Sequence, residues 1–218
     1  MATIKGTARN DVLRGTGAPD TITGGAGDDI IFGAPGDIKL DGGAGYDTLD
    51  LSSAAAPLRY AEFGGQLSYW PSDTSKTYVT NFERVIGSGH KDALLGASGA
   101  DTLVGNGGND TFEGGSGDDV FVGDFLAGYA ATGAAGTDVF QFSRNDSGND
   151  RILDFQYGVD HLLFYGWPQP TQIAPSGSDL VVNYGAGSSV TLVGLAYLSA
   201  DAYAGLFTYE NDGLIVPH

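Results

Sequence analysis

Apolar residues recur along this chain at intervals of nine, each seven places after a glycine and, in all but one unit, two places after an aspartate. The shared frame is Gly-x-x-Gly-x-Asp-x-apolar-x, as in residues 24–32. Ten units fit it, starting at Gly6, Gly15, Gly24, Gly33, Gly42, Gly87, Gly96, Gly105, Gly114 and Gly133. Their eighth positions are all apolar: Leu13, Ile22, Ile31, Leu40, Leu49, Leu94, Leu103, Phe112, Phe121 and Phe140. A flexible glycine-rich linker has no reason to keep this period, so the pattern predicts a repeat architecture.

Each unit predicts a turn followed by a very short strand. Glycine at the first and often the fourth position permits the positive φ angles of a tight turn. The apolar eighth residue then points inward from a strand of about three residues. Two units make one coil of 18 residues with a strand on each side, and successive coils stack at about 4.8 Å. We therefore expect an all-β solenoid.

The sixth position of the unit carries the candidate chemistry. Its residues are Asp11, Asp20, Asp29, Ile38, Asp47, Asp92, Asp101, Asp110, Asp119 and Asp138. Stacking places the sixth residues of alternate units on one edge, where aligned carboxylates would repel unless a cation lay between them. Calcium fits because it accepts six to eight oxygen ligands, including main-chain carbonyls. Zinc does not fit, since the sequence has no cysteine and its three histidines form no ligand cluster.

With these units in view, the chain resembles the RTX calcium-binding β-roll family. The resemblance implies a right-handed parallel β-roll with stacked calcium ions and a β-rich C-terminal cap. Residues 51–86 look like a spacer between repeat blocks 1–50 and 87–141. The closing segment, which includes residues 138–142, 148–155 and 158–160, is similar to that of RTX proteases and alginate epimerase modules, so we place a cap at 142–218.

The family resemblance also implies a ligand set. Carbonyls of positions two and four and the aspartate of one unit bind calcium together with carbonyls one and three and the aspartate two units on. The implied aspartates are Asp11, Asp20, Asp29, Asp47, Asp92, Asp101, Asp110, Asp119 and Asp138. The implied turn residues are Gly24, Gly25, Ala26, Gly27, Gly43, Gly45, Gly105, Asn106, Gly107, Gly108, Gly114, Gly115, Ser116 and Gly117.

Four pairs of aspartates fit this scheme best: Asp11 with Asp29, Asp29 with Asp47, Asp92 with Asp110, and Asp101 with Asp119. The partner expected for Asp20 is Ile38, so that site lacks a carboxylate unless the neighbouring Asp37 takes the place. We also consider a pair between Asp119 and Asp138, although the unit from Gly123 lacks its aspartate and the frame slips by one residue at Gly133.

Composition limits the partners and the conditions of folding. The 218 residues carry 10 basic and 27 acidic side chains, a net charge of −17, which argues against nucleic acid and anionic membranes as partners. Without calcium, aligned aspartates repel and glycine makes ordering costly, so we expect the roll to be largely unfolded. There is no apolar run of transmembrane length and no room for a cleavable signal before Gly6. RTX proteins are exported by type I machinery through a C-terminal signal, which the tail 205–218 resembles.

The segments outside the repeats predict further β-structure. Alternation at 67–69 and 78–80 predicts strands added to the stack, and residues 179–184 and 189–193 predict a β-hairpin. Residues 197–206 are expected to form the single helix. Tyr69 and Trp70 are read either as a seal over a calcium-free stretch or as a glycan-stacking surface, and Trp167 is read as cap core.

The sequence lacks three common catalytic motifs. It has no Gly-x-Ser-x-Gly elbow, no His-Glu-x-x-His zinc motif and no glycine-rich phosphate loop. The outward seventh positions form no ladder of identical residues, which argues against ice binding. We expect a non-enzymatic, secreted or cell-surface calcium-binding module that folds on extracellular calcium and supports secretion, stability or matrix interaction. A calcium-dependent polysaccharide-binding module is the alternative, and a carbohydrate-active enzyme a remote one.

Overall fold

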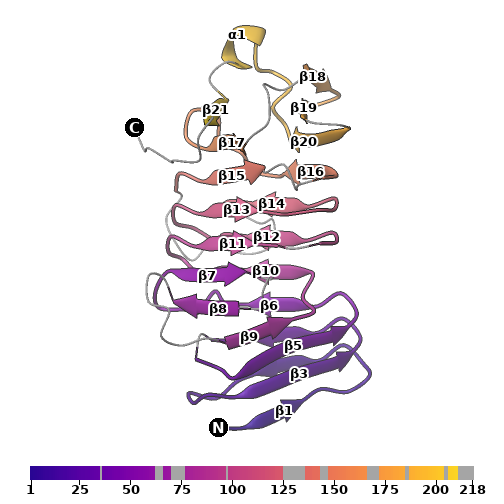
Figure 1. Ribbon diagram of the computed structural model, residues 1–218, viewed down its shortest axis with the longest axis vertical. Helices are drawn as coiled ribbons and strands as arrows, with labels where there is room; N and C mark the ends of the chain where they lie inside the picture. Colours follow the sequence, from indigo (N-terminus) through magenta and orange to yellow (C-terminus); the bar gives the residue numbers. More distant parts are fainter. Residues whose placement is uncertain are drawn as a thin grey trace.

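The structure is a computed structural model, and it describes residues 1–34, 36–61, 66–69, 77–96, 98–124, 136–142, 147–165, 172–184, 187–203 and 206–210. These residues form two long β-sheets that face each other along the molecule (Figure 1). The chain passes from one sheet to the other at almost every turn, so the described part is a parallel β-roll, as predicted.

One sheet, sheet A, has 11 strands. In spatial order they are β1 (Thr3–Lys5), β3 (Thr21–Ala26), β5 (Lys39–Ala44), β9 (Thr77–Thr80), β8 (Gln66–Tyr69), β7 (Leu58–Ala61), β11 (Ala93–Leu95), β13 (Thr111–Glu113), β15 (Val139–Phe142), β17 (His161–Tyr165) and β21 (Phe207–Glu210). All neighbours in this sheet are parallel except the two pairs that involve β8.

The opposite sheet, sheet B, has 10 strands. In spatial order from the N-terminal end they are β2 (Val12–Arg14), β4 (Ile30–Phe32), β6 (Thr48–Asp50), β10 (Arg84–Ile86), β12 (Thr102–Val104), β14 (Val120–Val122), β16 (Asn149–Ile152), β20 (Ser188–Leu192), β19 (Asp179–Tyr184) and β18 (Gln172–Ser176). A short helix, α1 (Ala200–Tyr203), lies at the C-terminal end of the molecule (Figure 1).

Strand register confirms the 18-residue coil. Ile22 pairs with Leu40 in sheet A, and Leu13 pairs with Ile31 in sheet B, both separations being 18 residues. Between Phe112 and Phe140 the separation grows to 28 residues while the register is kept, so a longer turn is absorbed without shifting the strands.

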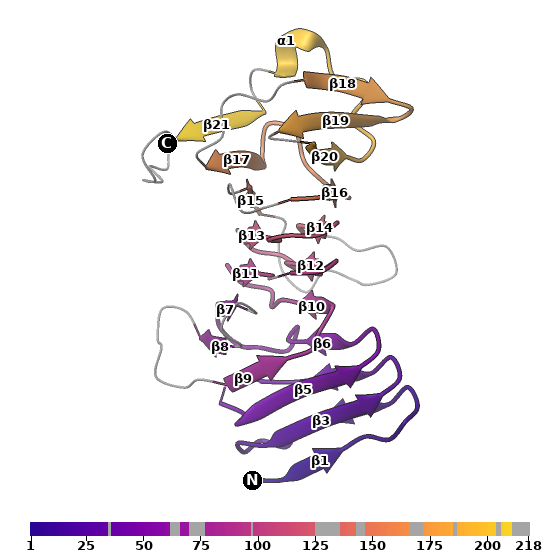
Figure 2. The same ribbon diagram turned by 45° about the vertical axis from the view of Figure 1, so that its right-hand side comes forward.

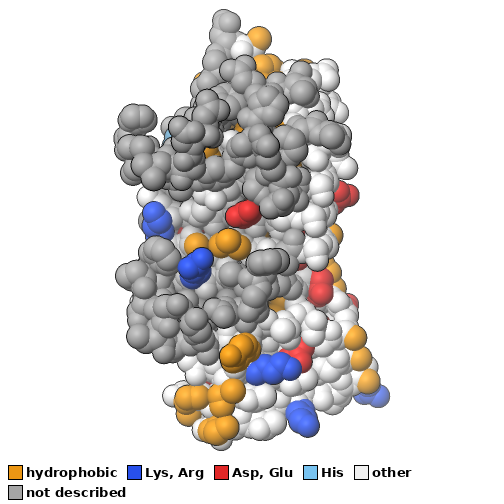
Figure 3. Space-filling model, viewed as in Figure 1, with side chains coloured by type: hydrophobic (Ala, Val, Ile, Leu, Met, Phe, Trp, Pro, Cys, Tyr) orange, Lys and Arg blue, Asp and Glu red, His pale blue; other side chains and the backbone are white. Residues whose placement is uncertain are grey.

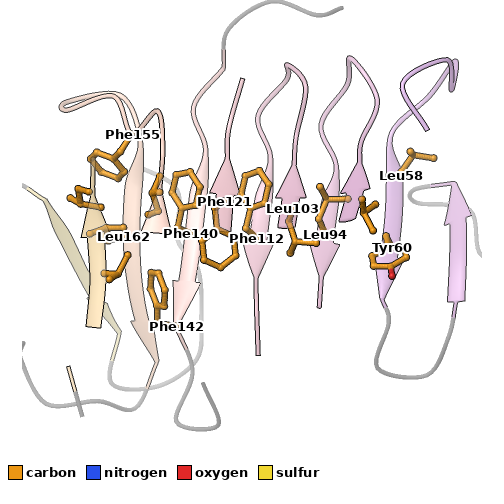
Figure 4. Close-up of a cluster of buried hydrophobic side chains, with 14 of the residues drawn as sticks. Leu58, Tyr60, Leu94, Leu103, Phe112, Phe121, Phe140, Phe142, Phe155 and Leu162 are labelled. Atoms are coloured by element: carbon orange, nitrogen blue, oxygen red, sulfur yellow. The ribbon is translucent and has the colours of Figure 1, made fainter. Parts of the chain in front are cut away.

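The eighth residues of the units form the core. Ile22, Ile31, Leu40, Leu49, Leu94, Leu103, Phe112, Phe121 and Phe140 are all at most 1% exposed, and Leu13, in the first coil, is half-buried. Figure 4 shows Leu94, Leu103, Phe112, Phe121 and Phe140 following one another between the sheets. The rings of Phe112 and Phe140 stack with their centroids 5.0 Å apart. The apolar ladder expected from the sequence is therefore present.

The spacer enters sheet A asymmetrically. Between β5 and β11, sheet A holds three spacer strands, β9, β8 and β7, whereas sheet B holds only β10 between β6 and β12. In Figures 1 and 2 the strands β3 and β5 slope relative to the flatter strands β11 and β13, so the roll bends where its two sides differ in length. The strands expected at 67–69 and 78–80 are confirmed.

The C-terminal segment continues the roll and then departs from it. β16 and β17 add one more strand to each sheet, and β18 and β19 pair antiparallel next to β20. The hairpin predicted at 179–184 and 189–193 is confirmed as β19 and β20. The predicted helix over 197–206 is wrong in extent, because among the described residues of that range only Ala200–Tyr203 is helical and the chain is in a strand from Phe207.

Three aromatic side chains for which the sequence predicts a role lie outside the described part of the structure. Trp70 and Trp167, like the side chain of Tyr69, belong to the positions that are not described. Within the described residues, no helix has the length and apolar character needed to cross a membrane. On the face shown in Figure 3, acidic and basic side chains are scattered singly among the described atoms.

Candidate metal centre

Acidic side chains line one edge of the roll where the chain enters sheet B, and we call this row the first ladder. Its members are Asp11, Asp29, Asp47, Glu83, Asp101, Asp119 and Asp150. In most rungs the main-chain N–H of one member donates to a carboxylate oxygen of the next. These distances are 2.8 Å from Asp11 to Asp29, 2.8 Å from Asp29 to Asp47, 2.7 Å from Asp47 to Glu83, 2.9 Å from Asp101 to Asp119 and 3.0 Å from Asp119 to Asp150.

A second ladder lies where the chain enters sheet A. It contains Asp20, Asp37, Asp92, Asp110, Asp138 and Asp160. The same N–H to carboxylate bonds measure 3.0 Å from Asp20 to Asp37, 2.8 Å from Asp92 to Asp110, 2.8 Å from Asp110 to Asp138 and 3.1 Å from Asp138 to Asp160. The spacer strands separate Asp37 from Asp92, so this ladder has two parts.

Five of these aspartates have one carboxylate oxygen that is buried and has no hydrogen-bond partner. They are the Oδ2 atoms of Asp29, Asp47, Asp110, Asp119 and Asp138, in residues that are at most 1% exposed. A buried polar atom without a partner is costly, and a buried charge more so. Among the described residues nothing pairs with these oxygens, so a proton or a bound cation would have to satisfy them.

Glycine at the first position keeps space open beside these oxygens. A Cβ atom added to Gly24 would collide with Oδ2 of Asp29 and with the carbonyl oxygen of Gly42 in the next coil. One added to Gly105 would collide with Oδ2 of Asp110 and with the carbonyl oxygen of Gly123. Carboxylate and carbonyl oxygens thus face the same gap between successive coils, which is the donor chemistry that calcium prefers.

The turn residues expected as ligands adopt the conformation that such turns require. Positive φ is found at Gly25, Gly27, Gly43, Gly45, Gly107, Gly108, Gly115 and Gly117, and also at Asn106, which has φ of 72°. The first-position residues Gly24, Gly105 and Gly114 lie against the carboxylates of their own units. Ala26 pairs with Ala44, and Ser116 bridges Ser98 and Ser147, so third-position residues stack from coil to coil.

Burial destabilises the ionised form of these carboxylates and so raises their pKa values. Burial, with neighbouring carboxylates as a smaller cause, raises the pKa of Asp110 to about 9 and that of Asp138 to about 8. It raises the pKa of Asp119 to about 7 and that of Asp92 to about 6. Without a counter-charge, Asp110 and Asp138 favour the neutral form at neutral pH; a bound cation would reverse this preference.

The fit to calcium depends on main-chain oxygens as much as on side chains. Among the described residues, no three histidine, cysteine, aspartate or glutamate side chains converge as a metal-binding group. A site here would need carbonyl ligands, which calcium accepts and zinc rarely uses. The glycine turns present those carbonyls beside the unpaired carboxylate oxygens, so the residues present suit calcium.

The structure brings together all four predicted aspartate pairs as neighbours along a ladder: Asp11 with Asp29, Asp29 with Asp47, Asp92 with Asp110, and Asp101 with Asp119. Their role as ligands remains a prediction. Asp37 does take the place left by Ile38, since its Oδ1 accepts the N–H of Asp20.

The predicted pair of Asp119 with Asp138 is wrong. Asp119 lies beside Asp150 in the first ladder, and Asp138 lies beside Asp110 in the second. The error came from placing a unit start at Gly133. The carboxylate of Asp138 lies against Gly123 instead, so the unit begins there and contains a longer turn.

Three ladder members were not predicted as site residues: Glu83, Asp150 and Asp160. Each stands two places before a buried apolar residue, namely Val85, Ile152 and Leu162. That acidic-x-apolar spacing is the end of the repeat frame, and it could have identified them even though all three lack the glycine at the first position.

Comparison with known proteins agrees with this geometry. The family model of the RTX calcium-binding nonapeptide repeat (4 copies) matches residues 5–37 and 86–125. No curated protein sequence matches the chain. Among solved structures, the extracellular lipase LipA from Serratia marcescens is similar at 23% identity and a TM-score of 0.32. The match covers 92% of this chain and 39% of the lipase, so this chain spans well under half of that protein's length.

Proposed function

We propose, from the premise that this chain is a member of the RTX calcium-binding repeat family, that it is a module whose folding is driven by calcium. The ladder aspartates and the carbonyls of the glycine turns are its ligands. The observation that carries the proposal is the set of five buried carboxylate oxygens without a partner. Three of them, on Asp29, Asp47 and Asp110, lie beside a main-chain carbonyl of the next coil.

The energetics favour folding coupled to metal binding. Twelve described aspartates are buried, namely Asp20, Asp29, Asp37, Asp47, Asp92, Asp101, Asp110, Asp119, Asp124, Asp138, Asp150 and Asp160. With 36 glycines in 218 residues, the unfolded chain also has a large conformational entropy. Calcium that binds only the folded roll contributes its binding free energy to folding, so the metal-free chain is expected to be largely unfolded.

Such coupling suits a protein that folds after export. Sites of the extracellular class bind calcium in the range of about 0.1–1 mM, far above cytosolic levels. The chain would remain unfolded inside the cell, pass a type I secretion channel and fold outside. In this role it supports the secretion and stability of a surface or matrix protein, without catalysis of its own.

A calcium titration followed by far-UV circular dichroism tests the proposal. We expect little β-structure in chelator, a cooperative gain of β-signal as calcium rises to millimolar levels, and reversal by added chelator. Magnesium at the same concentration is the control, and it should produce much less structure because it dehydrates reluctantly and demands octahedral geometry. A chain that is fully β-structured in chelator would refute the proposal.

A further inference from the structure

Three repeat units satisfy their own carboxylate through a hydroxyl at the second position. The main-chain N–H of Thr7 donates to Oδ2 of Asp11 at 2.6 Å, and the Thr7 hydroxyl donates to the same oxygen at 2.8 Å. Thr16 makes the same two bonds to Asp20, at 2.6 and 2.8 Å. We call such a unit self-capped.

The third self-capped unit lies after the spacer. Ser88 donates its main-chain N–H to Oδ2 of Asp92 at 2.6 Å and its hydroxyl to the same oxygen at 3.0 Å. In all three units the hydroxyl also accepts the N–H of the fourth residue: Arg9 at 3.2 Å, Ala18 at 3.3 Å and His90 at 3.2 Å. The repeated arrangement places two N–H groups and a hydroxyl inside each turn.

Four other units have the opposite turn, and we call them open. Their second residues are Gly25, Gly43, Asn106 and Gly115, and their fourth residues are Gly27, Gly45, Gly108 and Gly117. All eight have positive φ. The carboxylates of these four units, Asp29, Asp47, Asp110 and Asp119, are four of the five with an unpaired buried Oδ2; the fifth belongs to Asp138, whose unit has a longer segment after Gly123.

The two turns are alternatives for the same oxygen. In a self-capped unit Oδ2 accepts two hydrogen bonds, and the donors surrounding it present positive charge to the gap. In an open unit no donor reaches Oδ2. A carbonyl oxygen of the next coil lies beside the carboxylate in both kinds of unit, as beside Gly6 and Gly24, so the hydrogen-bond donors alone make the difference. A cation is stabilised by the second arrangement and repelled by the first.

We infer that the second and fourth residues of each unit decide whether the gap that follows it takes a calcium ion. Open units, with glycine or asparagine at the second position and glycine at the fourth, bind the ion. Self-capped units, with threonine or serine at the second and a larger residue than glycine at the fourth, leave the gap empty. The inference rests on the proposed function and assigns its ions to particular gaps.

The self-capped units occupy the starts of the ladders. Thr7 belongs to the first unit of the first ladder, Thr16 to the first unit of the second, and Ser88 to the first unit of the second ladder after the spacer. A ladder can therefore begin on a rung that needs no metal. Of the four predicted pairs, Asp11 with Asp29 and Asp92 with Asp110 then hold no ion, because each follows a self-capped unit.

The test counts calcium ions per chain by native mass spectrometry, with calorimetric titration as a second measure. Two double variants open a self-capped turn: Ser88→Gly with His90→Gly, and Thr7→Gly with Arg9→Gly. Each should bind one more ion than the parent chain. Ser88→Thr is the matched control, since it keeps the hydroxyl and should leave the count unchanged.

The converse variant closes an open turn. Asn106→Ser should lose one ion, because serine at the second position can donate its N–H and hydroxyl to Oδ2 of Asp110. Asn106→Gly keeps positive φ and should retain the ion. If the double variant at Ser88 and His90 does not fold, the two Asn106 variants and the double variant at Thr7 and Arg9 still test the inference.

The outcomes separate the inference from the proposed function. A parent chain that binds no calcium overturns the proposed function. A parent chain that binds calcium, with unchanged counts in the two double variants and in Asn106→Ser, overturns the inference alone. A gain in both double variants and a loss in Asn106→Ser confirm it.

Discussion

The two repeat blocks share one sequence frame but bury their carboxylates in different surroundings. In the first block burial raises the pKa of Asp37 and Asp47. In the second it carries the pKa of Asp110 to about 9, of Asp138 to about 8 and of Asp119 to about 7. The first block ends in an open coil, whereas the second is covered on one side by the spacer and on the other by the cap.

The hydrophobic cores of the two repeat blocks also differ in composition. Inward residues of the first block are isoleucine and leucine, such as Ile31 and Leu40. Those of the second block become aromatic, and Phe112, Phe121 and Phe140 contact one another ring to ring. The repeat frame thus specifies where the carboxylates lie, while the neighbouring coils determine how strongly burial disfavours their charged form.

The largest expected effect is an opposite response to pH with and without calcium. In chelator, carboxylates whose folded pKa exceeds the ordinary 3.8 favour the folded form when protonated. In chelator, the balance in the second block should therefore shift further toward the unfolded form as pH rises from about 4 to about 9, because each unit by which a folded pKa exceeds 3.8 contributes about 1.4 kcal/mol to that shift.

With saturating calcium the sign reverses. Bound carboxylates must be ionised, so their folded pKa is depressed and stability is lost as pH falls through the acidic range. The β-signal in far-UV circular dichroism across the pH series in chelator, and urea unfolding across the same series in calcium, check the two slopes. Two slopes of the same sign would show that the ladder carboxylates are not the ligands. Replacing Asp110 by Asn should flatten the slope in chelator.

The fold could be predicted correctly from the sequence wherever the steps between strands keep the constant length of nine residues. The step from Leu40 to Leu49 is nine residues, and its strands and carboxylate were placed correctly. From Leu49 to Tyr60 the step is 11 residues, and from Val79 to Val85 it is six, although Leu49 and Val85 remain 36 apart. The overall period therefore survives across the spacer while the individual turns do not.

The same physics explains which site residues were missed. Glu83 follows a turn too short for glycines, because only Asn81 and Phe82 separate β9 from it, and Asn81 itself has φ of 60°. The self-capping role of Thr7 and Ser88 could not be read from the frame, since it depends on whether the N–H of the second residue points toward the carboxylate. That orientation is a property of the folded turn.

A core substitution tests the aromatic side of the comparison. Phe112→Ala should lower the free energy of unfolding by about 3–5 kcal/mol, because the side chain is fully buried and stacks on Phe140. Leu40→Ala, the corresponding aliphatic position in the first block, should cost about 2–4 kcal/mol. Urea unfolding at saturating calcium measures both, and a smaller loss for Phe112→Ala would contradict the greater role given to the second core.

The smallest expected effect concerns a hydrogen bond that joins the two blocks across the spacer. The hydroxyl of Tyr46, in the last turn of the first block, lies 2.8 Å from that of Thr102 in β12. Tyr46 is 46% exposed, so water replaces most of what Tyr46→Phe removes, and we expect a loss of about 0.5 kcal/mol. Tyr197→Phe, an exposed tyrosine in the cap, is the control.

The blocks are already joined by the main chain, because β10 pairs with β6 on one side and with β12 on the other. Unfolding of Tyr46→Phe should therefore stay a single transition at saturating calcium. Separate transitions for the two blocks would mean that the side-chain bond, rather than the strand ladder of sheet B, couples them. In that case the differences in burial and core packing would describe two folding units instead of one roll with an uneven interior.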